Sequence, residues 1–404
     1  MNSYRTVTLA CNKYLIRTCK MVIRSGKTGS ICHISRGVAS LLTRTHASAP
    51  RREAPAPVSD SDKRPNLRAI DLARKIRQEK QNGKATGGGS EAAVPNPSVP
   101  VSPLQKRVIE LRQFTQQLQN VHPNVLAKHL HRGLILPHPE LAVINKPYGV
   151  SVQDGSRDKN NITDVLPILA KMMDGIRAGT QLHVCLGLDK ETTGTLLLAR
   201  TEEALAYVQN LHKNHQVERK YWVVAVGVPV PSEGVIDIPV IEREVTGAQP
   251  HFKMGLSPVY RVSEGGEGVT KVRANRQAQG AVTRYRVLDS SNGCSLVELQ
   301  PVTGVKHQLR VHMAYALGSP ILGDHKYSHW TKLAPQKLPD GVLRRLGLEQ
   351  SKARYLPLHL HARQLTVPEF KGQSDITVSC PLPKYFTSTL RRLQIPIPDE
   401  KEEE

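Results

Sequence analysis

Hydrophobic positions at helical spacing, together with capping residues, predict helices in two parts of the chain. Ser102, followed by proline, is a typical helix start, because serine caps the first turn and proline fits the first helical position. We expect this helix over residues 103–119 and a second, also opened by proline, over residues 123–131. Thr201 can cap a third helix over residues 202–213, with two glutamates at the positive end of its dipole.

Short apolar and β-branched runs predict strands around these helices. One run over residues 140–150 is interrupted by a Lys-Pro-x-Gly turn, and a run of leucines follows residue 194. Further strands are expected over residues 219–227, 234–240, 281–288, 295–299 and 358–363. Since helix and strand signals alternate irregularly and several connections are typical of hairpins, we predict an α+β fold. Its sheet should be mixed, mainly antiparallel and flanked by helices and loops.

Residues 303–314 follow the last of the central strands, and we expect a helix over this whole segment. Helical spacing would place His307, Arg310 and Ala314 on one side. Arg310 would then project from a rigid element rather than from a loop.

Composition separates the beginning of the chain from the rest. The first 52 residues contain ten Lys or Arg and no Asp or Glu, and they lack a secretory apolar core. This pattern is typical of a mitochondrial presequence, with a basic RNA-binding arm as the alternative. Residues 53–102 are rich in Pro, Ala, Ser and Gly and are predicted to be a disordered linker, with an amphipathic helix allowed over residues 66–81. A helical extension (103–132), a compact domain (133–390) and an acidic tail (391–404) complete the 404 residues.

The charge of the whole chain indicates a polyanionic partner. Lys and Arg exceed Asp and Glu by 21, and removing the ten charges of the first 52 residues leaves +11. Cys185, Cys294 and Cys380 are widely spaced and indicate neither a disulfide framework nor a metal site. No apolar run reaches the roughly 18–20 residues that span a bilayer, so we expect no membrane insertion.

Single residues in this sequence carry little functional information by themselves. Asp189 lies in a turn before the leucine run, and an isolated aspartate there usually serves the turn. Tyr221 alone would be read as a strand core residue, and Arg310 as a solvated helix residue. His359 and His361 have no neighbouring carboxylate or cysteine that would complete a metal site, so we expect no metal.

Six motifs in series change this interpretation, because together they resemble the RluA-type family of RNA pseudouridine synthases. The family's H-R-L-D-x-x-T-S/T-G motif is matched by Leu188-Asp189 and by Thr192-Thr193-Gly194. Its other motifs are matched by Arg219-Lys220-Tyr221, by Gly304 with residues 307–312, by residues 145–149, by Gly323-Asp324-x-x-Tyr327 and by residues 360–362. The resemblance covers about residues 133–385 in the family's order and implies the pseudouridine synthase catalytic fold for residues 133–390.

The resemblance implies roles for individual residues. Asp189 would be the catalytic carboxylate, Tyr221 the active-site tyrosine and Arg310 the arginine beside the aspartate. The implied substrate-binding residues are Lys146, Thr193, Gly194, Arg219, Lys220, His307, Gln308 and His361. The reaction breaks the C1′–N1 bond of uridine, turns the base and joins C1′ to C5, so no cofactor is expected. Asp189 could attack C1′ or take the 2′ proton, and the sequence leaves both routes open.

Asp189 must stay ionised in a pocket that we expect to be poorly hydrated, and a guanidinium from Arg310 would oppose the effect of burial on its pKa. Tyr221 would offer a flat face to the uracil and a hydroxyl near C5. The expected substrate is mitochondrial RNA, ribosomal RNA first and tRNA or mRNA as further candidates. We expect a monomer in the mitochondrial matrix, with mitochondrial ribosome assembly proteins as further partners.

Two departures from the family pattern motivate an alternative function. The family's His-Arg before Leu-Asp is Leu186-Gly187 here, and the arginine after Gly304 is Val305. Family members use the first arginine to fill the space of the flipped base. The alternative is therefore a catalytically weak RNA-binding factor for mitochondrial ribosome assembly on the same fold. Retention of Asp189, Tyr221 and Arg310 favours the enzyme.

Overall fold

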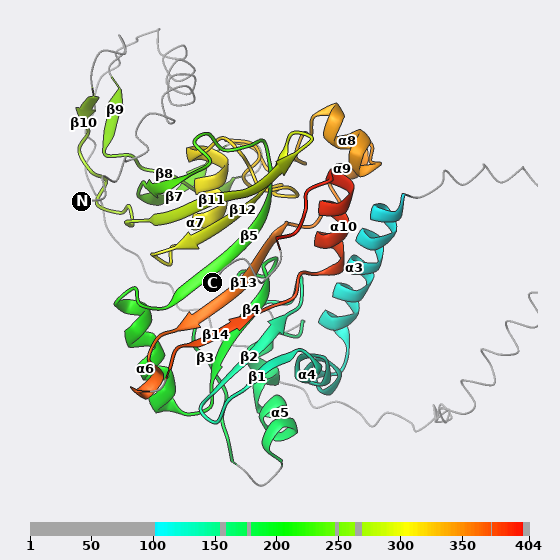
Figure 1. Cartoon of the computed structure of the whole chain (residues 1–404), viewed down its shortest axis with the longest axis vertical. Helices are drawn as coiled ribbons and strands as arrows, with labels where there is room; N and C mark the ends of the chain where they lie inside the picture. The colour runs from blue at the N-terminus through cyan, green and yellow to red at the C-terminus, as the bar shows by residue number, and fades with distance from the viewer. Residues whose placement is uncertain are drawn as a thin grey trace, which may run out of the picture. The chain divides into compact units, whose positions relative to one another are not determined.

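The computed structural model describes residues 102–153, 159–175, 179–246, 250–262, 269–372 and 374–398. The predicted presequence, the predicted linker up to residue 101 and the acidic residues 399–404 lie outside this range. The described part forms a ten-stranded sheet with the path β1-β2-β4-β13-β5-β12-β11-β6, to which β3 and β14 are added beside β4 and β13 (Figure 1). Its strand pairs are antiparallel except for β4 with β13. This confirms the predicted α+β fold.

The strands follow the apolar runs of the sequence. Those of the large sheet are β1 Leu134–Pro137, β2 Leu141–Lys146, β3 His183–Val184, β4 Thr193–Ala199, β5 Glu218–Val226, β6 Glu233–Asp237, β11 Val282–Ser291, β12 Cys294–Pro301, β13 Leu360–Val367 and β14 Ile376–Ser379. Two separate hairpins are formed by β7 Val240–Val245 with β8 His251–Leu256 and by β9 Tyr260–Val262 with β10 Val269–Lys271. The run predicted over residues 234–240 is thus divided between β6 and the start of β7. Pro239 lies at the division, because proline cannot donate to a strand ladder.

The helices of the described region are α3 Pro103–Asn120, α4 Pro123–Arg132, α5 Ile162–Asp174, α6 Glu202–Lys213, α7 Gln308–Val311, α8 Asp340–Leu346, α9 Gln350–Ala353 and α10 Lys384–Leu393. The side chain of Ser102 accepts from the backbone of Gln105, whose side chain in turn accepts from Ser102, and Thr201 caps α6 in the predicted place. Helix α10 runs past the predicted domain end at residue 390.

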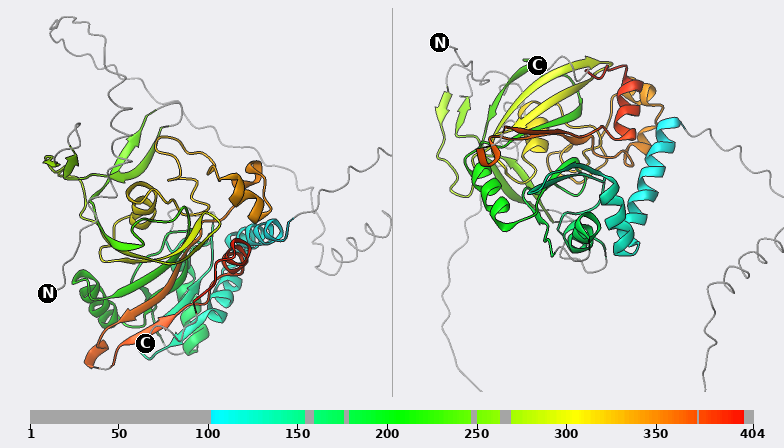
Figure 2. Two further views of the ribbon diagram at one scale, coloured as in Figure 1. Left: turned by 45° about the horizontal axis from the view of Figure 1, so that its top comes forward. Right: turned by 60° about the horizontal axis from the view of Figure 1, so that its bottom comes forward.

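The two helices α3 and α4 share the hydrophobic cores of the sheet. Leu104 and Val108 of α3 pack in one cluster with Leu390 of α10. Helices α3 and α10 lie side by side in Figures 1 and 2. Leu126 and Leu130 of α4 belong to a second cluster with residues of α5 and β2. Both helices of this segment therefore pack against the core.

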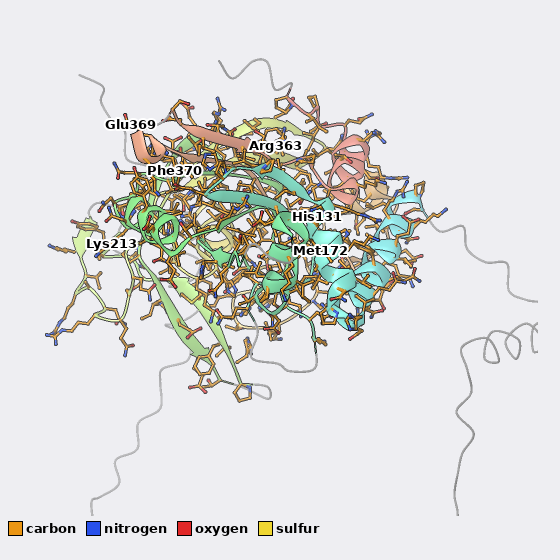
Figure 3. The ribbon with its side chains drawn as sticks, turned by 90° about the horizontal axis from the view of Figure 1, so that it is seen from below. His131, Met172, Lys213, Arg363, Glu369 and Phe370 are labelled. Carbon is orange, nitrogen blue, oxygen red and sulfur yellow. The ribbon has the colours of Figure 1, made fainter. Side chains whose placement is uncertain are left out.

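The turn after β13 closes one end of the sheet against α6. Phe370 is buried, and its ring meets those of Tyr207 and His138 edge-on at centroid distances of 5.4 and 5.7 Å. Glu369 and Phe370 are labelled at this turn in Figure 3. The Tyr207 hydroxyl donates to the carbonyl of Glu369. This packing anchors the far ends of β13 and β14, away from the ends that carry the motif residues.

The parallel contact between β4 and β13 depends on a glycine. His361 and Ala362 of β13 pair with Thr193 and Gly194 of β4. Gly194 has a φ of +110°, and a Cβ at this position would lie 2.2 Å from the carbonyl oxygen of Ala362. Only glycine tolerates both conditions, so Gly194 lets two motifs that are far apart in the sequence meet at the start of β4.

The prediction of one continuous helix over residues 303–314 is wrong. Helix α7 begins only at Gln308 and continues as a π-helical turn over His312–Ala316. The side chain of Gln308 accepts from the hydroxyl of Thr303 and from the N–H of Val305, which closes a turn before the helix. His307 has a φ of +55°, the left-handed conformation, so it lies at the corner and not on a helix face with Arg310.

Three further predictions concern the cysteines, a metal site and a membrane-spanning helix. Cys185, Cys294 and Cys380 are buried free thiols. Within the described residues no group of His, Cys, Asp and Glu is arranged to hold a metal ion, and no helix is long and apolar enough to cross a bilayer.

Candidate active site

The loop that carries Asp189 is held from below by a buried lysine. The ammonium of Lys146, at the end of β2, donates to the carbonyls of Pro147, Lys190 and Thr192 at 3.2, 2.9 and 2.8 Å. Lys146 is fully buried. Burial lowers the pKa of Lys146 to about 7, while Asp189 and Glu191 act in the opposite direction. Lys146 therefore holds residues 189–192, which we call the catalytic loop because the family resemblance assigns the catalytic carboxylate to Asp189.

Thr193 and His361 lie behind this loop in the core. The Nδ1 of His361 is 2.9 Å from the hydroxyl of Thr193, and its Nε2 is 3.2 Å from the carbonyl of Cys380. Since a carbonyl can only accept, Nε2 carries the proton and Nδ1 accepts from Thr193. Burial lowers the pKa of His361 to about 4, so its ring is neutral. With Gly194, these residues build the floor of the site rather than its surface.

Arg310 is held by a fully buried carboxylate. Its Nε and Nη2 donate to the two oxygens of Asp324, both at 2.8 Å, and its guanidinium lies 5.1 Å from the ring centroid of Tyr327. Burial would raise the pKa of Asp324, but the hydrogen bonds and charge of Arg310 and two backbone N–H groups lower it. Nη1 remains directed towards the catalytic loop, 3.6 Å from Glu191.

Asp189 itself is more open than the sequence predicts. Its side chain is 38% exposed, and Nε2 of His307 lies 3.8 Å from its Oδ2. Burial has the largest effect on the pKa of both Arg310 and Tyr221, and the charge of Asp189 raises both values. The strongest direct partner of Arg310 is Asp324, so the expected neighbour of Asp189 is tied to a second carboxylate.

A chain of hydrogen bonds determines which nitrogen of His307 carries its proton. The N–H of Met254 donates to the hydroxyl of Tyr327, which lies 2.6 Å from Nδ1 of His307. We assign the Tyr327 hydroxyl as the donor to Nδ1, which leaves the hydrogen of His307 on Nε2, the nitrogen that faces Asp189. Burial lowers the pKa of His307 to about 4 against the opposing charge of Asp189, and Arg310, Lys326 and Lys306 lower it further. A neutral N–H donor thus faces the carboxylate at neutral pH.

Tyr221 lies on β5 beside a small cavity. The cavity has a volume of about 10 Å³, room for about one water. It is lined by Leu186, Leu188, Thr195, Leu197, Arg219, Tyr221, Ala362 and Leu365. Burial raises the pKa of Tyr221, so its hydroxyl is protonated at neutral pH. The Nε of Arg219 is buried without a hydrogen-bond partner among the described residues.

The remaining predicted residues divide between surface and core. Lys220 is half-buried on β5, where it pairs with Gln364 of β13. Gln308 is buried, and its amide donates to the carbonyl of Val282 and the hydroxyl of Thr283, both at 2.9 Å. All hydrogen-bonding groups of the Gln308 side chain are thereby occupied by the fold, so this residue is structural.

The sequence identified Asp324 and Tyr327 as residues of a family motif but did not show which side chains they contact. In the structure, Asp324 orients Arg310 and Tyr327 orients His307. Glu191, two residues after Asp189, was given no role. The motif Gly323-Asp324-x-x-Tyr327 was the available signal, but which residues it would meet depends on the packing of α7 against this turn.

Comparisons with known proteins agree with this geometry. The sequence model of the family described as RNA pseudouridylate synthase matches residues 140–315. A zebrafish protein named mitochondrial pseudouridylate synthase RPUSD4 is 62% identical over 331 residues, which is 82% of this chain and 90% of that protein. The human protein of the same name is 51% identical, with 84% and 87% covered. A solved structure of human RNA pseudouridylate synthase domain containing 4 is 52% identical, covers 69% of this chain and 98% of its own, and has a TM-score of 0.61.

The resemblance seen in six separated motifs is therefore confirmed over most of the described residues. The matched region contains the catalytic loop, Tyr221 and Arg310. The chain belongs to the RNA pseudouridylate synthase family, whose members isomerise uridine to pseudouridine in RNA.

Proposed function

We propose that this protein converts specific uridines of mitochondrial RNA to pseudouridine, with Asp189 as the catalytic carboxylate. The observation that carries the proposal is the arrangement around Asp189. A neutral His307 N–H faces the carboxylate, and the Arg310–Asp324 pair lies beside it. Both relatives reported above are named mitochondrial, which supports the mitochondrial location.

Asp189 offers its carboxylate to the substrate. Nε2 of His307 lies 3.8 Å from one of its oxygens, and the partial exposure of the side chain leaves the oxygens accessible to a ribose. During the reaction the C1′–N1 bond breaks while Asp189 either bonds to C1′ or accepts the 2′ proton. When C1′ then bonds to C5, the bond between Asp189 and C1′ breaks or the 2′ proton returns to C2′, and the C5 proton is lost while N1 is protonated.

Tyr221 and Arg219 are placed to hold the detached uracil. The protonated Tyr221 hydroxyl can accept the C5 proton only by passing on its own, so it would work as a relay and not as a phenolate base. The unpaired Nε of Arg219 offers a donor to a uracil carbonyl. The cavity is too small for a uracil ring, so Leu186 and Leu188 must move when the base enters.

We propose ribosomal RNA as the first substrate, with tRNA or mRNA as further ones, and a monomeric enzyme in the matrix. A fusion of residues 1–52 to a reporter should enter mitochondria and be shortened there. Uniform cytosolic fluorescence of the fusion would reject the presequence.

A catalytically weak assembly factor that works with mitochondrial ribosome assembly proteins is the second candidate. Two observations favour it: Leu186-Gly187 and Val305 replace family arginines, and the cavity beside Tyr221 cannot hold a base as it stands.

One experiment separates the two candidates. Purified wild-type protein is incubated with transcripts of mitochondrial rRNA, tRNA and mRNA, and pseudouridine is mapped in each. The enzyme predicts new pseudouridines with wild type and none with Asp189→Asn. RNA binding without any new pseudouridine in any transcript would support the assembly factor.

A further inference from the structure

An exposed tryptophan lies at the end of a chain of aromatic rings that starts at the site. Trp330 is 44% exposed, and its ring meets that of Tyr315 edge-on at 4.6 Å. Tyr315 is followed by Tyr327 at 6.0 Å, and Tyr327 by His307 at 5.5 Å. The rings thus connect the surroundings of Asp189 with the surface between α7 and α8, which is drawn in yellow to orange in Figure 2.

The loop that carries this tryptophan is rigidly held, although its side chain is exposed. We call residues 328–333 the platform loop. The ammonium of Lys253, from β8, is 3% exposed and donates to the carbonyls of His329 and Lys332, both at 2.8 Å. The Tyr315 hydroxyl donates to the same His329 carbonyl at 3.3 Å.

The imidazole of His329 adds a further constraint to the platform loop. Its Nδ1 accepts the N–H groups of Thr331 and Lys332 at 3.2 and 3.1 Å. Burying an ammonium disfavours its charged form, and burial lowers the pKa of Lys253 to about 8. Lys253 and His329 therefore fix the platform loop, while the side chain of Trp330 in this loop stays 44% exposed.

Cations surround the platform loop on the side of the site. Lys326 lies 5.8 Å from the ring of Tyr327, next to Arg310. Lys332 and Lys337 are exposed. Partial burial is the main cause that lowers the pKa of His329, and the charges of Lys332, Lys253 and Lys337 lower it further. Lys306 pairs with Glu242, so one acid offsets part of this charge.

We propose that the platform loop binds an unpaired nucleotide of the RNA a few positions from the target uridine. The base stacks on Trp330, and the phosphates beside it contact Lys326 and Lys332. A flat aromatic surface in a positive field fits single-stranded RNA, because every base has a π-face and every phosphate a negative charge. A preorganised ring also loses little conformational entropy on binding. This inference rests on the proposed function, since it assumes that RNA reaches Asp189.

Tryptophan fluorescence tests the contact directly, because the chain contains only two tryptophans. Trp222 is buried, so a Trp222→Phe variant reports Trp330 alone. If this variant folds poorly, the difference between wild type and Trp330→Phe gives the same signal. A uridine oligomer should quench Trp330, and an abasic oligomer of equal length should quench it much less. Unchanged Trp330 fluorescence at RNA concentrations that saturate binding would overturn the proposal.

Binding and turnover of variants provide a second test. Trp330→Ala should weaken binding of the uridine oligomer roughly 5- to 100-fold, the usual range for one stacked base. It should leave the salt dependence of binding unchanged, whereas Lys332→Ala should reduce it. Trp330→Phe should restore most of the affinity. Phe114→Ala, which removes a 40% exposed ring on α3, is the matched control and should bind as wild type does.

The outcomes separate this inference from the proposed function. If wild type forms pseudouridine but Trp330→Ala keeps the wild-type KM and affinity, the platform is wrong and the enzyme assignment stands. The loop would then serve another partner, such as a protein. If Trp330 is quenched by RNA but no pseudouridine forms, the platform stands and the enzyme assignment fails.

Discussion

Two loops beside the site are each held by a buried lysine, but they present different chemistry. Lys146 donates to three carbonyls around the catalytic loop, and Lys253 donates to two carbonyls of the platform loop. The catalytic loop presents a half-exposed carboxylate to a reacting ribose, and the platform loop presents a tryptophan. Both use the same device, since an ammonium can satisfy several buried carbonyls that face one point.

The difference between the loops lies in what surrounds each ammonium. Lys146 is fully buried, and two acids, Asp189 and Glu191, favour its charged form while Lys190 disfavours it. The charged form of Lys253 is favoured by one acid, Asp324, and disfavoured by Lys326. The catalytic loop is therefore tied to the core more tightly, which suits a carboxylate that must be placed accurately. The platform loop has to hold only a flat ring.

The largest expected effect separates chemistry from binding. Asp189→Asn should lower kcat at least about 1,000-fold, as removal of a central catalytic group commonly does, while RNA affinity stays within a few-fold because phosphate contacts supply most of it. Single-turnover pseudouridine formation and RNA titrations measure the two quantities. Trp330→Ala should give the reverse pattern. Normal turnover by Asp189→Asn would remove this residue from the mechanism.

Replacing Lys146 and Lys253 in turn compares how much each lysine contributes to the free energy of unfolding. Lys146→Met leaves three buried carbonyls without this donor and should reduce the free energy of unfolding by roughly 3–5 kcal/mol. Lys253→Met should cost about 2 kcal/mol, since it leaves two. Denaturant unfolding measures both. Lys213→Met at the exposed end of α6 is the control and should stay within about 0.5 kcal/mol. Equal losses for Lys146 and Lys253 would contradict the comparison.

Acid should weaken the structure around both loops through four histidines. Burial lowers the pKa values of His307, His312, His359 and His361 to about 4. The unfolded chain therefore binds more protons than the folded one between pH 4 and 6.5. The stability of the folded state should be complete above pH 6.5 and fall by several kcal/mol as the pH approaches 4.

Urea unfolding at a series of pH values tests this effect. Replacing one ring, as in His359→Gln, should flatten the curve. Equal stability at pH 7 and pH 5 would show that these imidazoles are not neutral in the fold.

Tyr327 joins the two regions, because it stacks towards Tyr315 and donates to His307. Tyr327→Phe keeps the ring but frees Nδ1 of His307, so Nε2 no longer has to carry the proton that faces Asp189. We expect kcat to fall roughly tenfold, the effect of about 1.4 kcal/mol in the barrier, with the KM for RNA little changed. Tyr285→Phe removes a hydroxyl that donates to Pro231 away from the site and should be neutral. Equal kcat values for the two variants would exclude the proton arrangement.

The smallest effect concerns the edge of the catalytic loop. An added Cβ on Gly187 meets no atom within 4 Å, so Gly187→Arg has room to place a guanidinium near the extruded base. Activity on a uridine within a stem should rise by at most about tenfold relative to one in an open loop, because unstacking costs a few kcal/mol there. Single-turnover rates on one uridine in both settings provide the measurement. An equal change on both substrates would mean that another residue holds the RNA open.

The amino-acid sequence by itself determined the local elements and the position of the catalytic loop. Caps at Ser102 and Thr201, the apolar run of β4 and the turn before it depend on neighbouring residues, so their pattern is visible in the chain. The family motifs also singled out Asp189, Tyr221 and Arg310, and the charge of Asp189 acts on both of the other residues. Local hydrogen bonds and side-chain periodicity carry this information.

Only the tertiary structure decided what most of the other motif residues do. Lys146 binds a carbonyl 46 positions away and Lys253 one that is 76 positions away, so neither role can be read from local pattern. Gln308 closes a turn after which His307 has a left-handed backbone, so the helix expected from residue 303 begins only at Gln308. Lys146, His361 and Gln308 are each buried with their polar atoms paired inside the fold, which gives each a structural role and leaves substrate binding by them a prediction. Burial requires such pairing, and the partners are known only once distant strands have met.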